Sequence, residues 1–131
     1  LFLPVVGGIQ YHCEFYIIYS GNDTTGDYQC AFAIPAMAFT SDAIGQYTAY
    51  NTNLTVLATA THPGDTTTRW PFNGILTGVV DFATTLLLSG TFTFRAIGNG
   101  TLQYQFCNLS PAVGRTSRTN AGSWIMLTSP A

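Results

Sequence analysis

Apolar and polar residues alternate along several stretches of the chain, with the two-residue period of a β-strand that buries one face. In residues 100–108 the apolar series is Leu102, Tyr104 and Phe106, and threonine and glutamine fill the positions between them. Residues 9–19 repeat this alternation, whereas no stretch of useful length has the period of an α-helix. The pattern therefore predicts an all-β fold.

Turn-forming residues divide the alternating pattern into about eight or nine strands. The predicted strands are 9–19, 27–34, 43–50, 54–61, 72–82, 85–97, 100–107 and 119–127. Residues 20–26 predict a hairpin loop between the first two strands, and the glycines on either side of Asn99 predict a second, tight hairpin. Strand count and spacing favour a single domain over residues 1–131, a two-sheet antiparallel β-sandwich of jelly-roll type.

Aromatic residues on the buried sides of these strands are the expected core. The predicted core side chains are Phe15, Phe32, Phe92, Phe94, Phe106 and Trp124. Each contributes roughly 2–3 kcal/mol when it is fully buried. On this interpretation, replacing Trp124 with alanine costs about 3–5 kcal/mol of stability and prevents assembly.

Several strands carry apolar residues on both faces. Tyr16 and Ile18 stand on the face that meets water in a lone sandwich, and Ala31 and Ala33 do so in the next strand. This excess of apolar residues predicts burial between subunits. Closed cyclic symmetry is the usual arrangement of such subunits, so we predict that the chain associates with copies of itself.

The composition agrees with a surface that copies of the chain cover. Charged residues make up 8% of the chain and hydrophobic residues 47%, and the formal net charge is −2. Nucleic-acid binding requires several clustered cations and is therefore excluded. Arg115 and Arg118 share one loop, where we interpret them as solvated residues or as hydrogen-bond donors between subunits.

An apolar run over residues 74–88 does not predict a membrane helix. It is shorter than the roughly 20 residues that a spanning helix needs, and it contains Asp81. We interpret the run as two strand segments joined by a turn, and we predict no membrane insertion.

Three cysteines, Cys13, Cys30 and Cys107, cannot all pair within one chain. Cys13 and Cys30 each share a strand face with aromatic neighbours, which predicts small buried side chains. A disulfide between them stays open as the alternative, although the register of the predicted hairpin separates them. Reduced thiols would be consistent with assembly in a cytoplasm.

The sequence contains no catalytic signature, and we predict neither a metal nor a cofactor. His12 and His62 are far apart, with no cysteine or carboxylate at zinc-ligand spacing. Glu14 and Asp27 flank the first predicted hairpin loop and could form a carboxylate pair for acid–base work on a glycan. The favoured interpretation of this pair is an exposed or hydrogen-bonded one, so no enzyme is predicted.

Four N-x-Ser/Thr sequences, at Asn22, Asn53, Asn99 and Asn108, keep a second interpretation open. They are consistent with a secreted N-glycosylated surface protein, either an extracellular filament subunit or a lectin. A lectin would use exposed aromatic and amide groups in loops. The candidates are Tyr47, Tyr50, Asn51 and Trp70, whose alternative role is packing in the core or in an interface.

The strand-and-loop frame of residues 11–19, 27–35, 100–108 and 121–127 resembles β-sandwich domains of tailed-bacteriophage virion proteins. Such domains occur in head or tail fibres and in capsid decorations. The sequence departs from the family at Cys107-Asn108, where Ala-Gln-Asn is frequent, and residues 41–77 do not match it. The resemblance implies a homotrimeric structural or adhesive domain on the virion surface, with other virion proteins as partners and no active-site residues.

The resemblance also implies a preceding segment and a set of contact loops. Because the chain does not begin with Met, we expect an arm, a domain or a signal upstream of Leu1. The expected contact loops are 20–26, 62–70 and 111–120, which would be free to contact a neighbour, a cell-surface glycan or nothing. Their candidate contact residues include Asn22, Asp23, Arg115 and Arg118.

Overall fold

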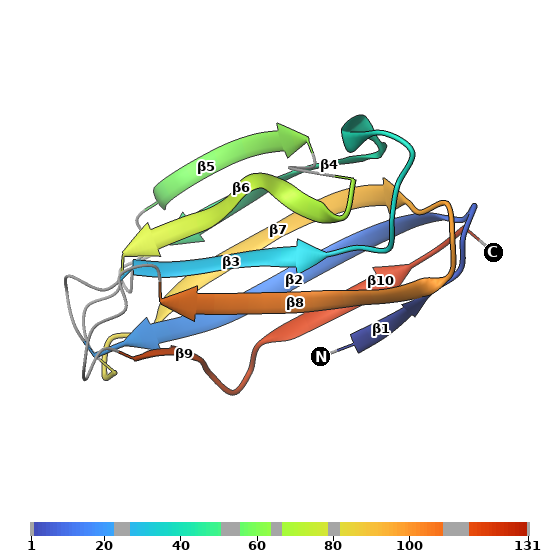
Figure 1. Ribbon diagram of the computed structural model, residues 1–131. Helices are drawn as coiled ribbons and strands as arrows, with labels where there is room; N and C mark the ends of the chain where they lie inside the picture. Colours follow the sequence, from blue (N-terminus) through green and yellow to red (C-terminus); the bar gives the residue numbers. More distant parts are fainter. Residues whose placement is uncertain are drawn as a thin grey trace.

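The computed structural model describes residues 2–22, 27–50, 56–63, 67–78, 82–108 and 116–130, and it confirms an all-β fold (Figure 1). A short 3-10 helix, η1, spans Thr40–Asp42. The strands are β1 (Phe2–Val5), β2 (Gln10–Gly21), β3 (Asp27–Ala33), β4 (Ala43–Tyr50), β5 (Val56–Pro63), β6 (Arg69–Gly78), β7 (Leu86–Arg95), β8 (Gly100–Asn108), β9 (Ser117–Thr119) and β10 (Trp124–Thr128). Seven of the eight predicted strand segments are therefore present with bounds shifted by up to four residues, whereas the predicted strand 119–127 is divided by a turn into the end of β9 and β10.

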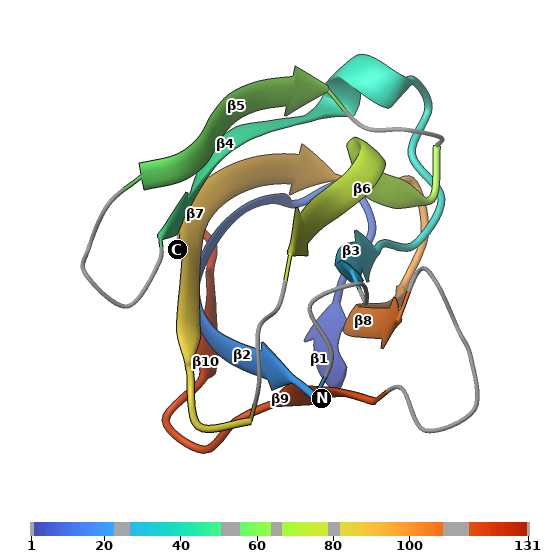
Figure 2. The same ribbon diagram turned by 90° about the vertical axis from the view of Figure 1, so that its left-hand side faces the viewer.

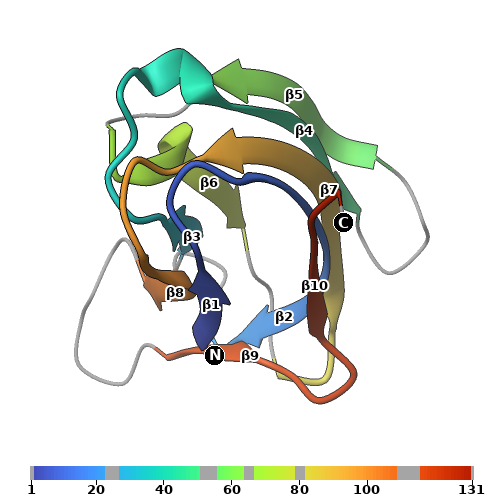
Figure 3. The same cartoon turned by 90° about the vertical axis from the view of Figure 1, so that its right-hand side faces the viewer.

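Two antiparallel sheets form the sandwich. The four-stranded sheet has the order β1-β8-β3-β6, and the six-stranded sheet has the order β10-β2-β7-β4-β5, with β9 paired to β2. The pairs β1–β8, β2–β7, β3–β6 and β4–β5 are those of one long hairpin folded over on itself, which is the jelly-roll arrangement. Figures 2 and 3 show the two sheets curving around a shared interior.

Both predicted hairpins are wrong, because the connections cross between the sheets. β2 and β3 lie in different sheets, and so do β7 and β8. Tyr19 and Tyr28 do face each other, but across the interior, with ring centroids 4.5 Å apart. The turn after β7 is tied to the turn after β1, because the Gly7 N–H donates to Asn99 Oδ1 at 2.9 Å.

The core is an aromatic cluster between the sheets. Four of the six predicted core residues, Phe15, Phe32, Phe92 and Phe94, are buried as expected. Trp70 lies at the centre and is fully buried, with its ring stacked on Phe92 at a centroid distance of 4.3 Å. The centre of the core thus comes from β6, a strand that the sequence pattern placed partly in a loop.

Two of the predicted core residues, Phe106 and Trp124, are not buried. Phe106 is on the inward side of β8 but is 44% exposed, because β1 pairs only with residues 100–103 of β8 and ends before it. Trp124 is 47% exposed, because it occupies the outward phase of β10 while Ile125 and Leu127 pack against the core. The predicted role of both side chains in the core is therefore wrong.

Gly45 allows β4 to approach β7 closely. A β-carbon at this position would overlap the Thr91 carbonyl oxygen and the Phe92 side chain. We expect Gly45→Ala to lower the free energy of unfolding by about 1–3 kcal/mol, measured by urea denaturation. Gly98→Ala is the matched control, because a β-carbon there meets no atom within 4 Å. Equal losses for the two variants would contradict this packing.

Candidate functional site

One end of the six-stranded sheet exposes an apolar patch to solvent. Its members are Tyr16 and Ile18 of β2, Leu87 of β7, and Trp124 and Met126 of β10, here called the Trp124 patch. Strand register places Trp124 opposite Tyr16, and the two rings stack with centroids 6.0 Å apart and planes at 4°. Trp124 and Met126 are the most exposed members, at 47% and 45%. An exposed apolar surface of this kind is a candidate contact site.

The prediction that Tyr16 and Ile18 occupy the outward face of β2 is confirmed. Both are partly exposed, whereas their neighbours Phe15 and Ile17 are buried. Ala31 and Ala33 likewise lie on the outward face of β3 in the four-stranded sheet. There they stand beside Gln105 and Gln103 of β8, and Ala33 also stands beside the exposed Arg69 of β6, so this second outer face carries small, amide and guanidinium side chains.

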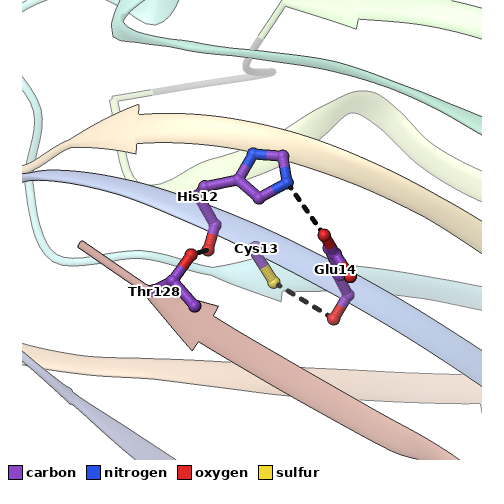
Figure 4. A network of polar contacts seen from close by, with 4 residues as sticks. All are labelled: His12, Cys13, Glu14 and Thr128. Carbon is purple, nitrogen blue, oxygen red and sulfur yellow. Dashed lines mark hydrogen bonds and ion pairs between the residues drawn. The ribbon is translucent and has the colours of Figure 1, made fainter. Parts of the chain in front are cut away.

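Polar side chains follow the apolar patch along β2. His12 Nε2 and Glu14 Oε1 are 3.4 Å apart, and both side chains are half exposed (Figure 4). The Thr128 hydroxyl donates to the His12 carbonyl oxygen at 3.3 Å and fastens β10 to β2. An exposed ion pair of this kind contributes little to stability. In the part of the chain that the structure describes, no group of three or more His, Cys, Asp or Glu residues could hold a metal ion.

The carboxylate pair considered in the sequence is not formed by the fold. Glu14 lies on β2 in the six-stranded sheet, and Asp27 begins β3 in the four-stranded sheet. The two residues therefore do not flank one hairpin. The separation removes the geometric basis for the pair.

A groove opens where the two sheets separate, between the uncovered half of β8 and the β9–β10 turn. It has a volume of about 460 Å³ and is here called the edge groove. Its lining is formed by Ile17, Tyr104, Phe106, Thr119, Asn120, Ala121, Ser123, Trp124 and Ile125. The rings of Tyr104 and Phe106 stack at 5.8 Å and form one wall. The Trp124 ring itself stacks on the outer face of the sheet, so this residue borders the groove.

Hydrogen bonds fix the polar side of the edge groove. The Tyr28 hydroxyl is hydrogen-bonded to the Tyr104 hydroxyl, and lies 2.8 Å from Thr119 Oγ1. The Ile18 N–H donates to Ser123 Oγ at 2.9 Å, and that hydroxyl donates to the Asn120 carbonyl oxygen at 2.8 Å. Burial raises the pKa of the Tyr104 phenol, so the hydroxyl stays neutral.

Contact residues predicted in loops have mixed outcomes. Asn22 is exposed, and its Oδ1 accepts a hydrogen bond from the Thr116 N–H at 2.7 Å. Arg118 lies on β9 rather than in a loop and is exposed, with its guanidinium carbon 3.5 Å above the centre of the Phe82 ring. Tyr47 and Trp70 are buried, so the prediction that they form ligand contacts is wrong. Asp23, Asn51, Asn53 and Arg115 and the side chains of Asp27, Tyr50, His62 and Asn108 lie outside the described residues.

The three cysteines are free, and only one of them is accessible. Cys13 and Cys30 are buried in different sheets, which leaves the alternative of a disulfide between them unformed, and Cys107 is exposed. Burial, assisted by the nearby Glu14 carboxylate, raises the pKa of the Cys13 thiol to about 12. Burial also raises the pKa of the Cys30 thiol. Since the thiolate is the nucleophile, these two thiols are unreactive for two reasons: reagents cannot reach them, and they stay protonated.

We expect one thiol of the folded chain to react with Ellman's reagent near pH 8, and three after unfolding in guanidinium. Cys107→Ser should abolish the reaction of the folded protein. Two or three fast-reacting thiols would contradict the burial of Cys13 and Cys30.

The raised pKa values of the Cys13 and Cys30 thiols also predict that the stability of the fold depends on pH. Their contribution to stability is fully present below the ordinary thiol pKa of 9.0 and is lost as the pH rises above it.

Comparisons of the chain with models of known protein families, with curated proteins and with solved structures find no match. Among the described residues, no helix is long and apolar enough to cross a membrane. The class that the fold defines is an all-β jelly-roll sandwich. The Trp124 patch and the edge groove are the surface features of this sandwich that suit a partner or a ligand.

Proposed function

We propose that the chain is a non-enzymatic structural domain of a tailed-phage particle. It would decorate the capsid or head a fibre, self-associate as a homotrimer, and leave its loops available to other virion proteins or to the host surface. The observation that carries the self-association is the Trp124 patch. The assignment to a phage particle and the number three rest on the resemblance of the strand-and-loop frame.

The chemistry of the Trp124 patch favours a protein partner. Trp and Tyr are over-represented among the residues that dominate binding energy in interfaces. The patch members are uncharged, and the chain as a whole carries few charges, so two copies can approach without strong repulsion. A second copy of the chain is the occupant that this surface fits.

Closing a ring of three requires two different surfaces on each subunit. In a ring with more than two members the contacts are heterologous, so the Trp124 patch of one copy must meet another surface of its neighbour. The outer face of the four-stranded sheet supplies a second surface, where Ala31 and Ala33 lie beside the amides of Gln105 and Gln103 and the exposed Arg69 lies beside Ala33. Two such surfaces support a closed ring.

The alternative is a secreted N-glycosylated protein, which one observation favours. Asn22 and Asn99 are both exposed at N-x-Thr sequences. Their side-chain oxygens accept backbone N–H groups, and both side chains lie at the surface, where a glycan can be attached. Glycosylation would place the chain on a cell surface or in an extracellular filament.

The intact mass of the protein from its natural source separates the two proposals. A phage protein folded in a bacterial cytoplasm should have the unmodified polypeptide mass. Hexose-bearing additions at Asn22, Asn53 or Asn99 would overturn the phage proposal and favour the secreted glycoprotein.

A further inference from the structure

We propose that the edge groove is a binding site for an uncharged carbohydrate. The groove lies on the side of the sandwich where β1 pairs with only half of β8, and its lining comes from β2, β8, β9, β10 and the turn between β9 and β10. Its volume of about 460 Å³ falls in the range of small-ligand pockets. The saccharide proposal goes beyond the proposed self-association, because the aromatic wall of the groove, Tyr104 and Phe106, lies outside the Trp124 patch.

An aromatic wall gives the groove a platform for the apolar face of a sugar ring. Phe106 points toward the interior, yet it is 44% exposed. Its ring is held from two sides, by Tyr104 at 5.8 Å and by Tyr28 at 5.7 Å. A ring that is rigidly held and still open to solvent offers contact area without further ordering of its side chain. A pyranose has C–H groups on one face that can pack on such a ring.

The hydroxyl groups that line the groove can still accept hydrogen bonds from a ligand. A hydroxyl can donate once and accept twice. Ser123 Oγ already accepts from Ile18 and donates to Asn120, so one lone pair is left. The hydroxyls of Tyr28, Tyr104 and Thr119 are hydrogen-bonded to one another, and a hydroxyl that donates once and accepts once retains one lone pair. The ligand that fits must therefore be rich in donors.

Asn120 contributes the complementary donor. Its Nδ2 group donates to Ser20 Oγ at 3.1 Å, which leaves its second N–H available. Its backbone N–H donates to the Ile18 carbonyl oxygen at 2.7 Å and fixes the turn. The acceptors on three hydroxyls and one amide donor match the hydroxyl groups of a saccharide, each of which donates and accepts.

The lining of the groove disfavours ionic ligands. Among the described residues that line the groove there is no Asp, Glu, Lys, Arg or His. The one titratable side chain among them is Tyr104, whose raised pKa keeps it neutral. An acidic sugar would lose hydration without gaining a cationic partner. The expected ligand is therefore a neutral saccharide.

Saturation-transfer NMR tests the proposal with maltose, cellobiose, lactose and diacetylchitobiose, and with sialyllactose as the anionic comparison. We expect saturable binding of at least one neutral disaccharide and none of sialyllactose. Phe106→Ala should weaken the binding about tenfold or more, whereas Phe39→Ala, which removes an exposed aromatic ring elsewhere, should leave it unchanged. Thr119→Val keeps the size of the side chain and should weaken binding by removing the acceptor.

The circular dichroism spectrum and melting temperature of each variant show whether it is folded. If the Phe106→Ala variant is folded and still binds the saccharide as tightly as the unchanged chain does, the proposal is overturned. No binding of any neutral disaccharide would overturn it as well, and so would selective binding of an extended peptide along the open edge of β8. The oligomeric state is measured separately, so loss of self-association and loss of saccharide binding remain distinguishable.

Discussion

Replacing Trp70 with alanine is expected to lower the free energy of unfolding by about 3–5 kcal/mol. Trp70 is fully buried, stacks on Phe92, and contacts the rings of Phe15 and Phe32 at centroid distances of 6.1 Å. Truncation would leave a large cavity that the surrounding aromatic rings cannot fill without losing their packing. Urea denaturation followed by far-UV circular dichroism gives the change directly.

Trp124→Ala is the matched control for Trp70→Ala, since the same side chain is removed from the outer face. The Trp124 ring is half exposed and stacks only on Tyr16 among the described rings, so the loss should be about 1 kcal/mol. A loss for Trp124→Ala as large as that for Trp70→Ala would mean that the two tryptophans have been assigned to the wrong sides of the sheet. If Trp70→Ala itself cost less than about 1 kcal/mol, the aromatic core around β6 would be wrong.

The same Trp124→Ala variant should strongly impair self-association while leaving the fold intact. Trp124 is the largest exposed member of the Trp124 patch, and truncating a central interface tryptophan commonly costs 2 kcal/mol or more. We expect the dissociation constant of the oligomer to rise about thirtyfold or more. Sedimentation velocity over a concentration series measures the shift from oligomer to monomer.

Ile97→Ala is a suitable control for the association experiment. Ile97 is 67% exposed and lies in the turn between β7 and β8, outside the Trp124 patch. Its replacement should leave the oligomer unchanged. If both variants dissociated equally, or if neither did, the Trp124 patch would not be the contact surface.

Alternation along the chain was sufficient to predict the class and most of the core. In the strands that contain Phe15, Phe32, Phe92 and Phe94, apolar residues recur with a clear period of two, and all four side chains are buried in the structure. Local sequence also located most strands, because glycine, proline and asparagine interrupt the alternation between them. What the alternation does not contain is the identity of the partner strand, so both hairpins were predicted where the chain crosses between sheets.

Trp124 shows why the sequence pattern does not always reveal which side chains of a strand face inward. Residues 124–127 are all apolar, so the period of two does not reveal which of them face inward. A shift of one residue moves every side chain to the other face. Pairing of β10 with β2 decides the phase, since it places Trp124 beside the outward Tyr16 and Ile125 beside the inward Phe15.

Phe106 shows a different limit, because its inward phase was predicted correctly and its burial was not. Exposure depends on whether another strand covers β8, and β1 covers only residues 100–103. Coverage is a property of the assembled sheets rather than of the local pattern. For the same reason, the edge groove could not be predicted from the alternation alone.

Sedimentation equilibrium of the purified chain at micromolar concentrations tests self-association most directly. We expect a discrete species with three times the mass of the 14.1 kDa chain, and its dissociation in Trp124→Ala. A monomer at every concentration, with the Trp124 patch exposed to water, would contradict the proposed structural role.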